Sequence, residues 1–169
     1  MNWLQQNWPR VVLRGFGLLH IAFGVWGIYF LLWAVVGYAV RWNEPRNPDL
    51  PYLREVFAVR TTINIVFLVV LFFAGIWLLR LRTQGVRASN WLFISFIAYF
   101  FADSLQFIVE FSLYGDIGPV GRSIGATAGT GNMGTVPLLL TGYPIIALIG
   151  LNVAHKSFRQ KKTSASTGG

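Results

Sequence analysis

The chain contains no cysteine, and only six of its 169 residues are acidic. The absence of cysteine excludes disulfides, cysteine-ligated zinc, iron–sulfur clusters and covalently attached c-type haem. Only 12% of the residues are charged, whereas a soluble domain of this size carries about 25%. Because 54% of the residues are hydrophobic, the composition indicates a membrane protein.

The formal net charge of +8 does not indicate a nucleic-acid partner. A nucleic-acid-binding domain needs Lys and Arg on the surface of a folded, soluble domain. Here the basic residues lie in the short segments between apolar runs, where they set the orientation of a membrane protein. We therefore expect the lipid bilayer as a partner, and no nucleic acid.

Apolar segments long enough to cross a bilayer occur at four places, and a spanning helix needs about 20 residues. Only a helix satisfies the backbone of such a segment in lipid, even where Val, Ile and Phe would favour a strand in water. The sequence therefore predicts an all-α membrane protein, an up-down bundle of four transmembrane helices that occupies residues 15–154. The expected spans are residues 15–38, 61–79, 91–114 and 135–154.

The two ends of the chain are more polar than the spans. Residues 1–14 form the expected interfacial segment, in which Pro9 should interrupt any helix. The first span is too long for the h-region of a signal peptide, about 7–15 residues, and no cleavage site closes it. Residues 155–169 are basic and then rich in Ser, Thr and Gly. We expect them to form a disordered cytoplasmic tail near anionic headgroups.

Glycine and proline predict local geometry in two spans. In the fourth span, Pro144 lies near the middle and should kink the helix. In the first span, small residues should let a neighbouring helix approach closely. These residues are Gly15, Gly17, Gly24 and Gly27.

The distribution of Lys and Arg predicts the orientation of the chain. The N-terminal segment, the second loop and the C-terminal tail together carry nine basic residues and no acid. The first and third loops carry five basic residues, and the first loop also holds acidic residues. Both termini are therefore expected to be cytoplasmic (N-in and C-in) in a multi-pass protein of a bacterial-type plasma membrane.

A polar stripe runs along the third span, which is otherwise apolar. At about 100° per residue, its polar positions fall on one face of the helix. An ionisable group in hydrocarbon costs roughly 3 kcal/mol or more, so these side chains should face protein, a partner or water. The stripe consists of Tyr99, Asp103, Gln106 and Glu110.

Polar residues of different spans can be matched by depth, because a helix rises ~1.5 Å per residue. Glu110 lies in the outer half, level with Asn64 and close to Arg60, and we expect these two as its partners. Asp103 lies near the midplane without a basic residue at its depth. We expect its carboxyl to be neutral and hydrogen-bonded; the candidate partners are Tyr99, Gln106 and Tyr143.

A second polar contact is expected in the inner half, between the first and fourth spans. It would involve His20 and Asn152, which reach similar depths, and Thr141, which shares a face with Asn152. A bis-histidine haem held by His20 and His155 is disfavoured, because their depths differ by about 6 Å. No Glu-x-x-His pair is present that would supply a carboxylate-bridged metal site. We therefore expect neither a metal nor another cofactor.

The sequence contains no Ser/His/Asp grouping and no phosphate-binding loop, so no catalytic residue is predicted. A GxGxxG match at 129–134 lacks the strand that a dinucleotide site requires. We expect a non-catalytic accessory or structural subunit of a larger membrane complex, or a homo-oligomer. Two alternatives remain open: a small proton- or cation-coupled transporter or channel component that uses Asp103 and Glu110, and a membrane-embedded enzyme that acts on lipid.

Overall fold

The computed structural model describes residues 3–40, 52–114, 118 and 142–167, and the statements below concern these residues. Their secondary structure is helical, as the sequence predicts. The helices are α1 (Trp3–Val40), α2 (Leu53–Leu79), α3 (Thr83–Tyr114) and α6 (Tyr143–Thr167).

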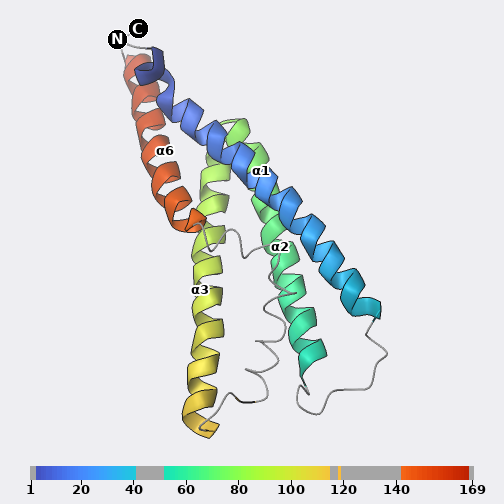
Figure 1. Cartoon of the computed structure of the whole chain (residues 1–169). Helices are drawn as coiled ribbons and strands as arrows, with labels where there is room; N and C mark the ends of the chain where they lie inside the picture. The colour runs from blue at the N-terminus through green and yellow to red at the C-terminus, as the bar shows by residue number, and fades with distance from the viewer. Residues whose placement is uncertain (1–2, 41–51, 115–117, 119–141, 168–169) are drawn as a thin grey trace.

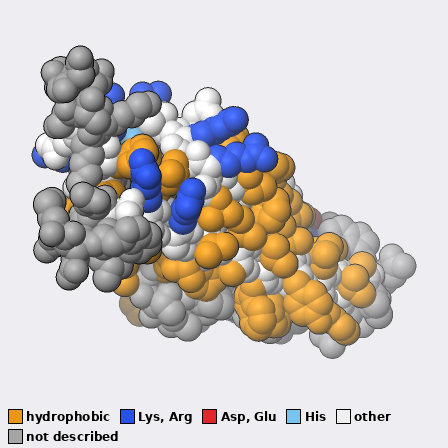
Figure 2. Space-filling model, turned by 90° about the horizontal axis from the view of Figure 1, so that it is seen from above, with side chains coloured by type: hydrophobic (Ala, Val, Ile, Leu, Met, Phe, Trp, Pro, Cys, Tyr) orange, Lys and Arg blue, Asp and Glu red, His pale blue; other side chains and the backbone are white. Residues whose placement is uncertain are grey.

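The helices pack mainly in sequence order (Figure 1). α1 crosses α2, α2 and α3 form an antiparallel hairpin, and α6 packs against both α1 and α3. The start of α1, the end of α6 and the turn between α2 and α3 lie at the same end of the molecule. We call it the basic end, because Lys and Arg side chains gather there (Figure 2). Its exposed basic residues are Arg10, Arg14, Arg80, Arg82, Arg87, Lys156 and Arg159.

The hydrophobic core lies in the half of the molecule near the basic end, where all the described helices meet. Away from this end the helices diverge, and α1 extends beyond its crossing with α2 (Figure 1). The core includes Leu13 of α1, Leu71 and Leu78 of α2, Val86 and Phe93 of α3, and Ala147, Leu151 and Ala154 of α6.

Pro9 does not interrupt α1, so this expectation was wrong. Proline lacks the N–H that would bond to the carbonyl of Gln5, four residues earlier. Pro9 is, however, among the fully buried side chains of the protein. Its packing offsets the lost hydrogen bond, and the helix begins at Trp3 instead of after the proline.

Two further helices begin before their predicted spans. α2 begins at Leu53 and α3 begins at Thr83, and each start lies eight residues before the start of the expected span. The turn between them is therefore short, and Leu81 adopts a positive φ of 53° in it. Arg87, expected in a loop, lies on α3.

The last helix differs most from its prediction. Pro144 is the second residue of α6, where a missing N–H costs nothing, so it produces no kink within this helix. α6 then continues to Thr167, through most of the segment expected to be disordered. Residues 135–141 of the expected fourth span lie outside the described residues.

Within the described residues, two helical segments are long and apolar enough to cross a membrane. They are Asn7–Gly37, with a mean hydropathy of 2.0, and Leu53–Leu79, with a mean hydropathy of 2.6. The rest of the protein covers only a small part of these segments. In the most apolar stretch of each segment, 22% of the first and 33% of the second is buried.

Glycine sets the distance between α1 and α2. A Cβ atom at Gly17 would lie 2.9 Å from the carbonyl oxygen of Gly75, and a Cβ atom at Gly75 would lie 2.7 Å from the carbonyl oxygen of Gly17. Gly24 is similarly close to the backbone of Leu68, at 3.2 Å. The predicted close approach is thus confirmed at Gly17 and Gly24, whereas a Cβ atom at Gly15 would meet nothing within 4 Å.

Replacing Gly75 by alanine should destabilise the protein. The added methyl group would collide with backbone atoms of α1 that cannot move alone, and overpacking of this kind costs about 1–3 kcal/mol. The loss should exceed the gain of about 0.5–1 kcal/mol that alanine gives in a helix. Thermal unfolding of the purified chain, followed by circular dichroism, measures the net effect.

The matched control is Gly15→Ala, at a position with open space around it. This variant should be as stable as the parent chain or more stable. Equal melting temperatures for Gly75→Ala and Gly15→Ala would show that the two helices do not cross at Gly17 and Gly75.

Candidate functional site

A buried polar cluster of the described interior is centred on His20 of α1. His20 is completely buried, at 0% exposure. Its Nδ1 atom lies 2.7 Å from the hydroxyl oxygen of Tyr143 on α6, and its Nε2 atom lies 3.0 Å from the Oγ of Ser89 on α3. One imidazole therefore connects three helices. We call His20, Ser89 and Tyr143 the His20 node.

Each polar side-chain atom of the His20 node has a hydrogen-bond partner. Ser89 Oγ lies 2.8 Å from the carbonyl oxygen of Gly85, within its own helix. The two ring nitrogens of His20 bond to Tyr143 and Ser89, and the tautomer of the ring sets which atom of each pair donates. A buried polar group without a partner costs about 1–3 kcal/mol, so this arrangement holds the three helices in one relative position.

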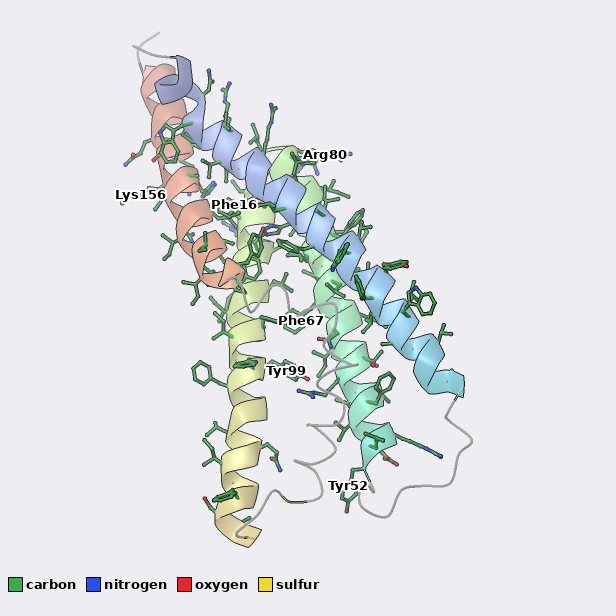
Figure 3. All side chains as sticks on the ribbon, in the orientation of Figure 1. Phe16, Tyr52, Phe67, Arg80, Tyr99 and Lys156 are labelled. Carbon is green, nitrogen blue, oxygen red and sulfur yellow. The ribbon has the colours of Figure 1, made fainter. Side chains whose placement is uncertain are left out.

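Aromatic rings enclose the node. The centroid of the Phe93 ring lies 5.4 Å from that of the His20 ring. The centroid of the Phe23 ring lies 4.9 Å from that of the Tyr143 ring. Phe16 also faces Tyr143, at 6.2 Å, and Figure 3 shows it between α1 and α6. Such edge-to-face and tilted pairs add about 0.5–1.5 kcal/mol each beyond the area that they bury.

The cavity beside the His20 node is too small for a substrate. It has a volume of about 10 Å³ and is lined by apolar side chains, among them Phe67, Phe93 and Pro144. Even a water molecule needs about 10–15 Å³ and two or more polar partners. Both ring nitrogens of His20 are also engaged, so neither has a lone pair to offer to an iron atom. The geometry favours a structural role for this histidine.

A second polar contact joins α3 and α6. The amides of Asn90 and Asn152 bond reciprocally, with Nδ2–Oδ1 distances of 2.9 and 3.2 Å. Asn152 Nδ2 also donates to the carbonyl oxygen of Leu148, at 2.7 Å. We expected Asn152 to contact the first helix beside His20, but its partner lies on α3. The contact between α1 and α6 is made by His20 and Tyr143 instead, and Thr141 lies outside the described residues.

The polar stripe of α3 is connected to α2 through Tyr99. Arg60 Nε donates to the Tyr99 hydroxyl at 3.2 Å, and Tyr99 points from α3 toward α2 (Figure 3). Arg60 and Asn64 are both buried, and Gln106 is half-buried. The side chains of Asp103 and Glu110 lie outside the described residues. The expected contact of Glu110 with Arg60 and Asn64 therefore stays a prediction, as does proton or cation transport by the two acids.

Sequence reasoning missed Ser89 and Asn90, and it did not pair Tyr143 with His20. Ser89 and Asn90 precede Trp91, where the third span is expected to begin, so the sequence places them in the preceding loop. Tyr143 is one of three expected partners of Asp103, whose side chain lies outside the described residues; the Tyr143 hydroxyl bonds to His20. The signal that could have identified Ser89 is its depth, which matches that of His20 once α3 begins at Thr83.

At the basic end, α6 runs beside the start of α1, and the Arg10 guanidinium lies 5.8 Å from the centre of the Phe158 ring. Partial burial, together with the charges of Arg159 and Arg87, lowers the pKa of His155 below its usual value. His155 therefore adds no charge to this end at neutral pH. Glu55, an acid whose side chain the structure describes, lies near the start of α2, at the other end of that helix.

Comparisons of the chain with protein-family models, curated protein sequences and solved structures gave no match.

Tyr143→Phe should destabilise the protein by about 1–3 kcal/mol, because the buried Nδ1 atom of His20 loses its hydrogen-bond partner on α6. The ring contacts with Phe16, Phe23 and Phe93 remain in this variant. The difference in unfolding free energy between variant and parent chain measures the cost.

The control is Tyr29→Phe, since Tyr29 is an exposed residue of α1. A surface change of this kind should alter stability by at most about 0.5 kcal/mol. If both substitutions had the same small effect, the bond between Tyr143 and His20 would contribute nothing to the fold.

Proposed function

We propose that the chain is an integral membrane protein whose described helices cross the bilayer. The observation that supports this proposal is the exposed apolar surface of these helices. Large apolar side chains are exposed along α1, α2, α3 and α6, for example Trp33 at 65%, Phe101 at 64% and Ile149 at 63%. A soluble protein rarely leaves contiguous apolar areas of this extent in water, and the hydrocarbon of a bilayer covers them without cost.

The proposed orientation places the basic end in the cytoplasm, with both termini and the turn between α2 and α3. Seven exposed Lys and Arg side chains of the described residues lie there, and Figure 2 shows Lys and Arg side chains next to the apolar surface. Basic residues next to membrane-spanning helices remain on the cytoplasmic side.

The proposed role is that of a non-catalytic accessory or structural subunit, in a larger membrane complex or in a homo-oligomer. The observation that carries it is the His20 node, whose polar atoms all bond to one another or to the backbone. The Asn90 and Asn152 amides likewise bond to each other. These hydrogen bonds between helices fix the helices in place, as such bonds do in membranes, and the exposed helix faces remain for protein partners or lipid.

Labelling of single cysteines tests the topology directly, because the chain has no cysteine of its own. We expect a membrane-impermeant maleimide to label Glu55→Cys in intact cells. Arg82→Cys and Lys156→Cys should react only after the cells are permeabilised. All three positions are exposed. Two results would contradict the proposed orientation: labelling of all three positions in intact cells, or labelling of all three only after permeabilisation.

Purification in a mild detergent tests the proposed role. The chain should leave the column as an oligomer or with stoichiometric partner proteins, and the mass measured by multi-angle light scattering should exceed that of one 19.0 kDa chain. A monomer that remains active in a transport or lipid-turnover assay would contradict a purely structural role.

A further inference from the structure

A cleft of about 430 Å³ lies between α2 and α3. It is separate from the contact with α1, which uses Leu68 and Gly75 of α2. The cleft is lined from another face of α2 by residues that include Val66 and Val70, and from α3 by residues that include Trp91 and Leu92. The His20 node and the Asn90–Asn152 pair do not line this cleft.

The wall of the cleft is suited to hydrocarbon. Its lining is apolar except for Thr62 and Ser95, and the Thr62 hydroxyl already donates to the carbonyl oxygen of Ala58, at 2.9 Å. On α3 the lining extends from Ala88 to Ser95, which corresponds to about 10 Å at the helical rise per residue. One leaflet of the hydrocarbon core is about 15 Å thick, so the cleft covers much of the depth of a single leaflet.

Positive charge lies at one end of the cleft. Arg87 directly precedes Ala88 and is one helical turn before Trp91, so it lies at the edge of the α3 face that lines the cleft, between that face and His155 of α6. The exposed Arg80 and Arg82 lie in the adjoining turn, and Figure 3 shows Arg80 at the end of α2. Among the described residues, no acidic side chain neighbours these arginines in the sequence or at the basic end.

Trp91 marks the boundary between the arginines and the apolar cleft. Its side chain is 72% exposed, and its ring lines the cleft. Tryptophan is enriched at the level of lipid headgroups, where its ring contacts hydrocarbon and its N–H contacts polar groups. The order along α3 is therefore cation, interfacial aromatic residue and apolar cleft, which matches the order of phosphate, glycerol ester and acyl chain in a phospholipid.

We propose that the cleft between α2 and α3 binds one acyl chain of an anionic phospholipid, whose phosphate lies against Arg87 and the turn from Arg80 to Arg82. This inference rests on the proposed membrane location. A transmembrane helix of a second copy fits less well, because a helix is about 10–12 Å wide with its side chains. Over the length of the cleft it would have roughly twice the volume of the cleft.

The probe is palmitoyl-oleoyl phosphatidylglycerol, compared with phosphatidylcholine of the same chains. Purified, delipidated chain is incubated with each lipid in detergent, and the retained lipid is counted by native mass spectrometry. The parent chain should retain phosphatidylglycerol preferentially. Arg87→Gln should lower its affinity about fivefold, the effect of one basic residue on an anionic headgroup. Val66→Trp should fill the cleft and abolish retention of both lipids at this site.

Two matched controls separate the cleft from general effects. Arg14→Gln removes a charge at the same end but on α1, and Ile94→Trp adds the same side chain on an exposed face of α3 outside the cleft. Both controls should retain lipid as the parent chain does. Soluble glycerol phosphate, which has the headgroup charge without a chain, should not compete.

Several results would overturn this inference. Retention that is unaffected by Arg87→Gln and Val66→Trp, or equally reduced by the controls, would show that the cleft is not the site. Displacement by glycerol phosphate would show that the acyl chain is not recognised, and an altered oligomer mass in Val66→Trp with unchanged lipid retention would assign the cleft to a second copy. Carbonate extraction tests the membrane location separately. If carbonate removed the parent chain from membranes, the proposed membrane location itself would be wrong, and not the lipid site alone.

Discussion

The relative position of the helices depends on the two hydrogen bonds of the His20 ring. In the proposed membrane location, the helices gain little from burying apolar surface, because lipid is as apolar as leucine. Packing and interhelical hydrogen bonds must then hold them together. His20 connects α1 to α3 through Ser89 and to α6 through Tyr143. α2 joins this unit by the close approach of Gly75 to Gly17, less than one turn from His20 on α1.

The location of these contacts explains why the core lies in one half of the molecule. The His20 node, the glycine crossing and the Asn90–Asn152 pair all lie in the half near the basic end, and the buried leucines lie around them. In the other half α2 and α3 are connected through Arg60 and Tyr99. This asymmetry leaves long apolar faces exposed on α1 and α3. We regard these faces as the surface for lipid or partner subunits.

The helical class and the approximate position of the helices could be predicted from the sequence, because apolar runs of this length leave few alternatives. The helix ends could not be predicted in the same way. Pro9 is tolerated because it is buried, and α3 extends through Ser89 and Asn90 because these polar residues find partners on other helices. Hydropathy measures only the preference of each segment for lipid. It cannot predict pairings between polar residues of different helices, because these pairings depend on how the helices pack.

The candidate site shows the same limit. Depth matching predicts that His20 and Asn152 make polar contacts between helices, and both do make interhelical hydrogen bonds. Depth does not define which neighbour a side chain faces: it pairs Asn152 with α1, whereas its partner is on α3. Tyr143 illustrates a second reason: it begins α6, so its position depends on where that helix starts.

The protonation state of His20 tests the account most directly. In nitrogen-15 NMR of the labelled chain at neutral pH, with His20 assigned by comparison with His20→Gln, we predict a neutral ring with one protonated and one unprotonated nitrogen. The ring proton should exchange slowly with solvent, and Tyr143→Phe should shift the Nδ1 resonance while Ser89→Ala shifts that of Nε2. A charged imidazolium, a ring whose proton exchanges freely with solvent, or resonances that neither substitution shifts would contradict the claim that His20 holds α1, α3 and α6 together.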